Sequence, residues 1–321
     1  MRTYLGVDVG SVTTKLVLLD ESDELLSSIY LRTQGSPVAI IKEGLKEIQS
    51  QIPNETEICG VATTGSGRAL AGVILGADMV KNEITAHAVA AMSHVPDVQT
   101  IFEIGGQDSK IIIISDGVVV DFGMNSVCAA GTGSFLEHQA ERLNIRIEDF
   151  GDHALRSENP ARIAGRCTVF AESDMIHKQQ MGYPIDDIIY GLCQSMVRNY
   201  LNNVALGKEI LPRIVFQGGV AFNKGIVKAF NETFHTEVFI PPHNELMGAI
   251  GAAMLVREEV GSDGHRTNFK GFSVSQTEFQ MSSFICKACS NLCEISQISA
   301  DGGVLARWGG RCDMWERVET K

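Results

Sequence analysis

Residues 5–20 read LGVDVGSVTTKLVLLD, and residues 100–115 read TIFEIGGQDSKIIIIS. The two stretches align without a gap, and in each of them two apolar runs flank a short polar turn, a pattern that predicts a β-hairpin. The alignment pairs Asp8 with Glu103, Gly10 with Gly105 and Lys15 with Lys110. Such a repeat indicates an internal duplication. We therefore expect an α/β protein built from two related halves with a cleft between them.

Length and composition are those of a globular chain with more than one domain. The chain has 321 residues, of which 44% are hydrophobic and 21% charged, ample for a buried core. Apolar periodicity predicts helices over residues 36–51, 85–93, 133–143, 169–180, 185–205, 223–234 and 246–258, and a strand over residues 213–216. We expect a first domain over residues 1–97, a second over residues 98–244, a helix over residues 245–260 that packs back on the first domain, and a linker with a cysteine-rich module over residues 262–321.

Charge and hydropathy exclude two classes of partner. The formal net charge is −12 and no basic stripe is present, so nucleic acid is not an expected ligand. The longest nearly apolar stretch, residues 246–256, is shorter than the roughly 20 residues that span a bilayer. The N-terminus begins with a strand pattern instead of a signal peptide. We expect a cytoplasmic protein without a membrane partner.

Both hairpin turns have the features of a phosphate site. Their backbone N–H groups and hydroxyls can bind phosphate oxygens, and Asp8 and Asp108 could hold Mg²⁺ directly or through water. A third element, VFQGGVAFN at residues 215–223, leads from a strand through paired glycines into a helix. Its small residues would let a flat base lie on the backbone. One hairpin alone would be an ordinary turn, but two aligned copies with this third element favour nucleotide binding.

These segments resemble the ATPase fold of actin, sugar kinases and Hsp70. The resemblance implies two duplicated ATPase domains around a nucleotide cleft that binds ATP or ADP with Mg²⁺. It implies catalytic roles for Asp8 and Asp108 at the metal and for Gln107 in positioning the attacking water. The matching nucleotide-binding residues are Gly10, Ser11, Thr13, Lys15, Gly105, Gly106, Gly218, Gly219 and Asn223.

Two central cysteines each precede a predicted helix. Cys128 leads into AAGTGSFLEHQAERL and Cys167 into TVFAESDMIHKQQ, and a helix N-terminus stabilises a thiolate or an anionic cluster. Two cysteines per chain supply half the ligands of a [4Fe–4S] cluster, and a two-fold dimer supplies all four. Spacing alone favours buried structural cysteines, as it does for Cys59 and Cys193.

The residues around Cys128 and Cys167 are more specific than the spacing of the two cysteines. SVCAAGTGSFLE and GRCTVFAESDMIH closely resemble activators of 2-hydroxyacyl-CoA dehydratases, a family that includes reductases of double-cubane cluster proteins and the ATPase subunits of benzoyl-CoA reductase. The resemblance covers about residues 3–258. It implies a homodimer that shares one [4Fe–4S] cluster through Cys128 and Cys167. ATP would then drive a low-potential electron from ferredoxin or flavodoxin to a partner metalloprotein, whose identity stays open.

The tail carries four further cysteines. Cys286-x₂-Cys289-x₃-Cys293, followed by Cys312, has the spacing of metal ligands. Zn²⁺ and a second Fe–S cluster are both chemically reasonable in this second metal site. Free thiols without metal are the weaker alternative, because three cysteines within eight residues are seldom only packing.

Two other functions stay open for the body of the chain. A small-molecule kinase of the same fold would need a catalytic base beside a substrate pocket and would not use the cysteine pair. An iron–sulfur redox sensor would use ATP for structure alone. ATP hydrolysis coupled to reduction of a partner would distinguish electron transfer from both.

Overall fold

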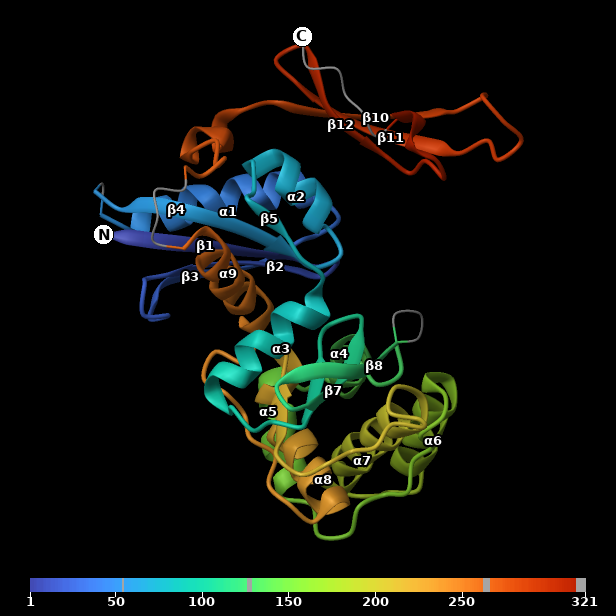
Figure 1. Ribbon diagram of the computed structural model, residues 1–321. Helices are drawn as coiled ribbons and strands as arrows, with labels where there is room; N and C mark the ends of the chain where they lie inside the picture. The colour runs from blue at the N-terminus through green and yellow to red at the C-terminus, as the bar shows by residue number, and fades with distance from the viewer. Residues whose placement is uncertain (54, 126–128, 262–265, 316–321) are drawn as a thin grey trace.

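The computed structural model describes the chain except for residues 54, 126–128, 262–265 and 316–321, and for the side chain of Asp313. Its described residues form three sheets with helices packed around the first two (Figure 1). The first sheet has the strand order β3-β2-β1-β4-β5. Its strands are β1 (Arg2–Val9), β2 (Thr13–Leu19), β3 (Leu25–Arg32), β4 (Glu57–Thr64) and β5 (Met79–Val80). The helices that follow in this part are α1 (Pro37–Gln51), α2 (Arg68–Leu75) and α3 (Glu83–His94).

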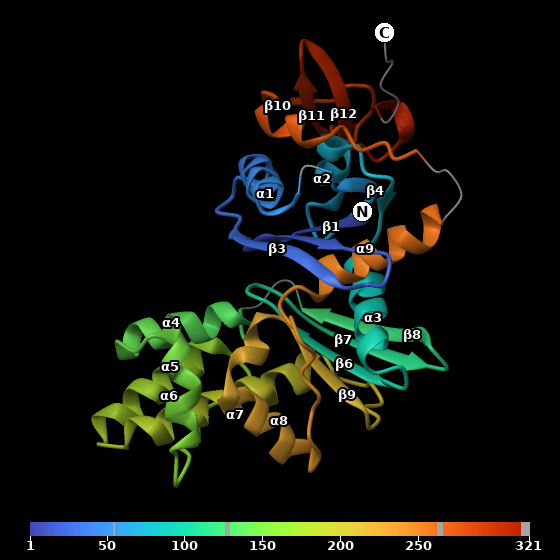
Figure 2. The ribbon, with the colours of Figure 1, turned by 90° about the vertical axis from the view of Figure 1, so that its left-hand side faces the viewer.

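The second sheet has the order β8-β7-β6-β9. Its strands are β6 (Thr100–Ile104), β7 (Ser109–Ser115), β8 (Val118–Asn125) and β9 (Ile214–Gln217). The helices between β8 and the tail are α4 (Gly133–Leu143), α5 (Ile147–Leu155), α6 (Thr168–Gln180), α7 (Ile185–Asn203), α8 (Lys224–Phe234) and α9 (Met247–Val260). Helices α4 to α8 lie on one side of this sheet (Figure 2).

The two sheets repeat one arrangement of strands. In both, three consecutive strands form an antiparallel meander, and the first of them also pairs with a parallel strand, β1 with β4 and β6 with β9. The registers also match, since Asp8 lies opposite Lys15 and Glu103 opposite Lys110. Both hairpins predicted from the sequence are therefore present, and the aligned polar residues occupy equivalent places.

Helices α3 and α9 fill the space between the two sheets. They contribute alanines and other small residues to a core that also contains strand residues of both sheets. The packing is close: a Cβ on Gly251 of α9 would lie 1.8 Å from the carbonyl oxygen of Ala86, and one on Gly6 of β1 would lie 1.9 Å from that of Ala249. A larger residue at either glycine would push these elements apart. Helix α9 packs on β1 and β4 as well as on α3.

The segment expected to be a linker is held against the first sheet's helices. Lys270 donates its backbone N–H to Leu75, the Lys42 ammonium donates to the carbonyl of Thr277, and Thr267 bonds to Asp78. Phe269, Phe272 and Val274 pack on the core below. The sequence did not predict this docking, because three apolar residues at irregular spacing in a polar segment produce neither a helical nor a strand pattern.

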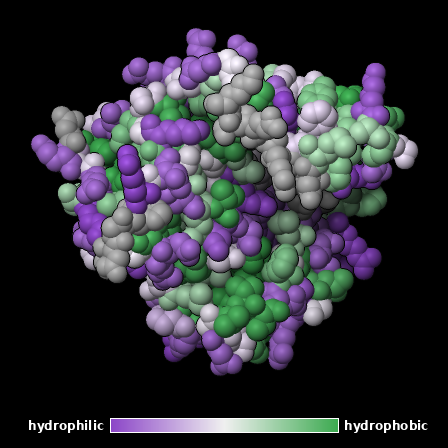
Figure 3. Space-filling model, turned by 45° about the horizontal axis from the view of Figure 1, so that its top comes forward, coloured by the Kyte–Doolittle hydropathy of each residue, from purple (hydrophilic) through white to green (hydrophobic). Residues whose placement is uncertain are grey.

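The tail forms a third sheet. It consists of β10 (Phe279–Ile285), β11 (Glu294–Ala300) and β12 (Gly303–Trp308) in sequence order, all antiparallel. Short 3₁₀ turns at Gly219–Phe222, Phe272–Gln276 and Asp313–Trp315 complete the elements. On the face in Figure 3 hydrophilic side chains lie around smaller hydrophobic patches. Among the described helices, none has the length and apolar character needed to cross a membrane.

Candidate functional site

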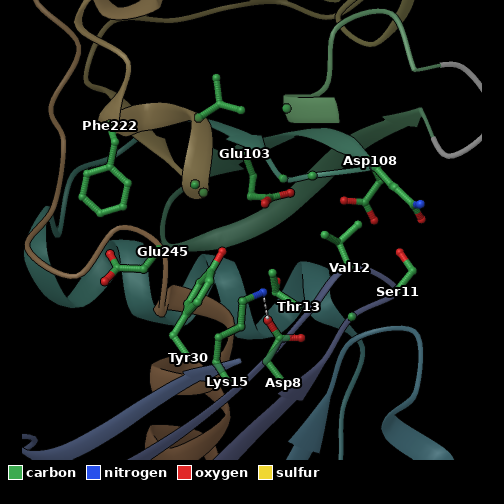
Figure 4. Close-up of a pocket in the computed structure, with 18 of the residues that line it drawn as sticks. Asp8, Ser11, Val12, Thr13, Lys15, Tyr30, Glu103, Asp108, Phe222 and Glu245 are labelled. Carbon is green, nitrogen blue, oxygen red and sulfur yellow. Dashed lines mark hydrogen bonds and ion pairs between the residues drawn. The ribbon is translucent and has the colours of Figure 1, made fainter. Parts of the chain in front are cut away.

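A cavity of about 680 Å³ lies between the two halves and is lined by residues of both sheets (Figure 4). All twelve residues that the sequence assigned to nucleotide, Mg²⁺ or water line it: Asp8, Gly10, Ser11, Thr13, Lys15, Gly105, Gly106, Gln107, Asp108, Gly218, Gly219 and Asn223. In Figure 4, Ser11 and Asp108 lie at one end of the cavity, and Phe222 and Glu245 at the other. The cavity is thus elongated, with the hairpin turns at one end.

The first hairpin supplies a carboxylate paired with a lysine. Asp8 ends up 6% exposed near the end of β1, and the Lys15 ammonium lies 3.1 Å from its Oδ2. Burial alone would raise the pKa of Asp8, but Lys15, with a smaller contribution from Lys110, lowers it below its usual value. Asp8 is therefore ionised at neutral pH. The turn beyond it is closed by a bond from the Gly10 N–H to the carbonyl of Thr13.

The second hairpin places a lysine among three carboxylates. Lys110 is 2% exposed, and its ammonium lies 2.8 Å from Glu103, 3.0 Å from Asp108 and 3.4 Å from Glu83. Burial would lower the pKa of Lys110, but Glu103, Asp108 and Glu83 together raise it. Glu83 comes from α3 in the first half, so this ion pair joins the two halves at the floor of the cavity.

The Gly218-Gly219 turn has the backbone geometry that a base-binding segment needs. Gly218 has φ +91°, and a Cβ there would lie 2.4 Å from the carbonyl oxygen of Ile104, so only glycine fits. Gly219 is open: the nearest atom to an added Cβ is the Tyr30 hydroxyl at 3.8 Å. Asn223 is the N-cap of α8 and accepts from two backbone N–H groups through its Oδ1. Its main role in this structure is thus to begin a helix beside the cavity.

A buried histidine joins the halves a second time. His87 of α3 lies 2.8 Å, through its Nδ1, from the Gln217 side-chain nitrogen at the end of β9. Burial, helped by the Lys110 charge, lowers the pKa of His87 to about 3, so the ring is neutral. Sequence reasoning did not assign Glu83 or His87 to the site. No local pattern marks them, because each reaches the cavity only when α3 packs between the sheets.

The oxygen ligands at the floor suit Mg²⁺. Four carboxylates, Asp8, Glu83, Glu103 and Asp108, face two lysines, Lys15 and Lys110, and this excess of negative charge favours a cation. Mg²⁺ usually keeps several waters and takes further ligands from substrate phosphates, so one or two carboxylates are enough. The described residues contain no group of three or more His, Cys, Asp or Glu side chains placed to hold a metal unaided.

The far end of the cavity offers groups of another kind. Tyr30, Phe222 and Glu245 line it, and the Oε2 atom of Glu245 is buried without a hydrogen-bond partner among the described residues. A carboxylate oxygen of this kind can accept a hydrogen bond from a ligand hydroxyl or amino group. At the mouth, Arg32 and Glu137 form an exposed ion pair of 3.1 Å across the cleft.

The structure agrees with only some of the predictions made for the cysteines. Cys167 is the partly exposed N-cap residue of α6, as the sequence predicted, whereas Cys128 lies outside the described residues. Cys59 and Cys193 are buried, as expected. Cys286 is buried, Cys293 is partly exposed, and Cys289 and Cys312 are exposed. These four described tail cysteines do not form a ready metal site.

Residues 5–256 match the BadF/BadG/BcrA/BcrD ATPase family. The chain belongs to this family. A relative in Acidaminococcus fermentans, the (R)-2-hydroxyglutaryl-CoA dehydratase activating ATPase, is 34% identical over 258 residues, which cover 78% of this chain and 95% of the relative. The 2-hydroxyisocaproyl-CoA dehydratase activator of Clostridioides difficile is 32% identical and covers 79% of this chain and 95% of its own.

Solved structures give this family member the same fold. The crystal structure of component A of the Acidaminococcus fermentans (R)-2-hydroxyglutaryl-CoA dehydratase superposes with a TM-score of 0.74 at 30% identity, covering 82% of this chain and 100% of that one. The ATPase thus has the α/β actin-like fold that the hairpins predicted. The family match ends before the third sheet, so the tail cysteines lie beyond it.

Proposed function

We propose that the chain hydrolyses ATP in the cavity and uses this reaction to drive low-potential electron transfer. In the proposal ATP and water give ADP and phosphate, while one electron passes from ferredoxin or flavodoxin through a [4Fe–4S] cluster to a partner metalloprotein. The family supports the ATPase half of this proposal. Relatives named as dehydratase activators support a partner enzyme as the acceptor.

The chain's residues have distinct roles in ATP hydrolysis. The turn around Gly10 and Ser11 and the turn around Gly105 and Gly106 would bind phosphate oxygens from opposite sides. Asp8 and Asp108 would hold Mg²⁺ and its waters, whose charge offsets the charge that develops on the phosphates. Gln107 lines the same end of the cavity, and its side-chain amide would orient the attacking water.

The proposed coupling of the nucleotide site to the cysteines is supported by one observation. The turn around Gly105 and Gly106 is hydrogen-bonded to α4, the helix that follows Cys128. The Gly133 N–H donates to the Gly105 carbonyl at 2.9 Å, and the Ser134 N–H donates to the Gly106 carbonyl at 2.8 Å. A phosphate that shifts this turn would therefore shift the first turn of α4. Because Cys128 lies five residues before Gly133, the nucleotide state would reach the cysteine segment.

Helix α7 contacts Gly131, which follows the Cys128 segment, and the residues just before Cys167. Asn199 donates through its Nδ2 to the carbonyls of Gly165 and Arg166, just before Cys167. On the other side, a Cβ on Gly131 would lie 3.1 Å from the Asn199 Oδ1. Asn199 thus lies between the two segments. The cluster, when bound, would accept and donate one electron.

Exposed apolar residues beside these segments favour a second copy as the source of the other two ligands. Val118, Val120, Phe122 and Met124 alternate along edge strand β8, each between 48% and 62% exposed. Val169 and Phe170 on the first turn of α6 are each 65% exposed. Two-fold symmetry would place both surfaces against their own copies and bring four cysteines to one axis. We propose a homodimer on this basis.

The experiment is an anaerobic comparison of the wild-type protein with Cys167→Ser. We expect the wild type to be a brown dimer with about four irons per two chains and to reduce an acceptor only with MgATP. Cys167→Ser should lose the iron and the reduction, but should still bind nucleotide, because the cavity lies elsewhere. Cys59→Ser, a cysteine away from both segments, is the matched control. A wild type that is colourless and phosphorylates a small acceptor would be a kinase, and a wild type whose iron survives Cys167→Ser would contradict the cluster assignment.

A further inference from the structure

The end of the third sheet gathers all four tail cysteines, although they span residues 286–312. Cys286, Cys289 and Cys293 occupy the loop between β10 and β11, and Cys312 follows β12. Because β11 is the central strand and both neighbours are antiparallel to it, its start and the ends of β10 and β12 lie at the same end of the sheet. The topology therefore brings to one end of the sheet four cysteines that are spread over residues 286–312.

Cys286 and Cys293 form the base of this arrangement. Ile285 pairs with Glu294, and the next pair is closed by a bond from the Cys286 N–H to the Cys293 carbonyl at 2.8 Å. Side chains directly opposite in an antiparallel pair project from the same face, with Cβ atoms about 4.5–5.5 Å apart. Both sulfur atoms can therefore reach one ion bound between them.

The other two cysteines lie in turns next to this pair. Cys289 is three residues after Cys286, and Leu292, which follows it in the loop, has φ +44°. On the other side of β11, Trp308 pairs with Ser296, and a Cβ on Gly309 would lie 2.5 Å from the Glu294 carbonyl oxygen. The chain thus passes beside the start of β11 three residues before Cys312. Both Cys289 and Cys312 are exposed, so their turns can move without disturbing a core.

The third sheet lacks the buried surface that would stabilise this end. Among the described residues from 279 to 315, four hydrophobic residues are buried: Cys286, Ile295, Ile298 and Ala300. Ile298 packs into the core of the first sheet, which anchors the middle of β11 but not the cysteine end. Small units with so little core commonly depend on a metal or on disulfides.

The four tail cysteines have the chemistry of a metal site. The thiolate is the form that binds metal. Four sulfur ligands with a Cys-x₂-Cys arm are typical of tetrahedral structural zinc.

We propose that Cys286, Cys289, Cys293 and Cys312 bind one structural Zn²⁺ at the end of the third sheet. Cys286 and Cys293 provide the preformed pair, and binding draws the Cys289 and Cys312 turns onto the ion with release of the thiol protons. The site does not depend on the proposed electron transfer. It lies at the end of the third sheet, whereas the cavity is lined by residues of the first two sheets and Cys167 lies at the start of α6.

The test uses the full-length protein, reduced and freed of metal under anaerobic conditions, then titrated with Co²⁺ alone. Tetrahedral thiolate ligation gives Co²⁺ an intense sulfur-to-metal absorption, and Zn²⁺ should displace it at about one ion per chain. Cys289→Ser and Cys312→Ser should each weaken Co²⁺ binding at least about tenfold, the scale of losing one ligand-shell interaction. Cys59→Ser, the matched control, and Cys167→Ser should both keep the absorption, which separates this site from the proposed cluster.

Three results would overturn the zinc site. One is the absence of the absorption band in the wild type. Another is a band that survives both tail substitutions. The third is a different use of the same cysteines: a disulfide between Cys286 and Cys293 in the protein as isolated, or iron with sulfide that disappears in Cys312→Ser.

Discussion

Asp8 combines burial, ionisation and a place near the hairpin turns at one end of the cavity. Lys15 keeps it charged, and the position of Gly248 shows how tightly it is enclosed: a Cβ there would lie 2.9 Å from the Asp8 Oδ2. A buried carboxylate with one lysine partner is costly to keep, and the proposed Mg²⁺ would use its charge. The proposed ATP hydrolysis should therefore depend on this single side chain.

We expect Asp8→Asn to lower the rate of ATP hydrolysis on the order of 100-fold, the scale of losing one preorganised charge at a reacting centre. The amide keeps the shape of the side chain but cannot neutralise a metal. Steady-state phosphate release with MgATP measures the effect. Asp116→Asn is the matched control, because Asp116 is exposed on the turn after β7 with φ +51°, which asparagine tolerates. An unchanged rate in Asp8→Asn would make Asp8 a structural residue.

At the scale of elements, α7 organises the second half. Its buried residues include Tyr190, Leu192, Met196 and Tyr200, and Tyr200 also donates its hydroxyl to the carbonyl of Lys110 on β7. Asn199 is a buried polar residue of this largely apolar helix: it is 3% exposed and bonded to the segment before Cys167. A buried amide with specific carbonyl partners fixes a loop in one place.

We expect Asn199→Ala to weaken retention of the proposed cluster, since the carbonyls of Gly165 and Arg166 lose their donor and the loop before Cys167 loosens. Iron content after gel filtration should fall at least about twofold, which corresponds to a fraction of the energy of one buried hydrogen bond, while ATP hydrolysis changes little. Asn203→Ala, one turn later on the same helix and more exposed, is the control. Equal iron content in the two variants would remove Asn199 from this role.

At the scale of the whole molecule, the two halves are joined at the floor of the cleft by buried polar contacts. Glu83 reaches Lys110, and His87 reaches Gln217. Both side chains come from α3, which the small residues of α9 allow to pack closely against α9. The exposed Arg32–Glu137 pair joins the halves at the mouth, where solvent screens it and its contribution is small.

The pH dependence of folding should report on His87. Its folded pKa is about 3 and its ordinary value 6.5, so between these values the unfolded chain binds more protons than the native one, and stability falls as pH is lowered. From above pH 7 to pH 5 the loss from this group is about 2 kcal/mol. Urea unfolding at pH 7.5 and pH 5 should therefore show a larger decrease for the wild type than for His87→Gln. Equal decreases would mean that the ring is not held neutral in the native state.

The sequence by itself determined the local pattern of this protein. Apolar runs and glycine-containing turns led to both hairpins, and the residues aligned between the two repeats, Asp8 with Glu103 and Lys15 with Lys110, occupy equivalent places in the two sheets. The helix that begins after Cys167 was also predicted, because its start depends on neighbouring residues alone. The twelve cavity residues could be chosen from the same local motifs.

The tertiary structure decided which distant groups meet. Glu83 and His87 belong to the cavity only because α3 lies between the sheets, and Glu245 only because the loop before α9 returns to it. The docking of Phe269 and Phe272 on the first half and the approach of Gly309 to the start of β11 also depend on packing and strand order. Such contacts carry no periodic signal along the chain, because they arise from surfaces that become neighbours only after the elements have formed.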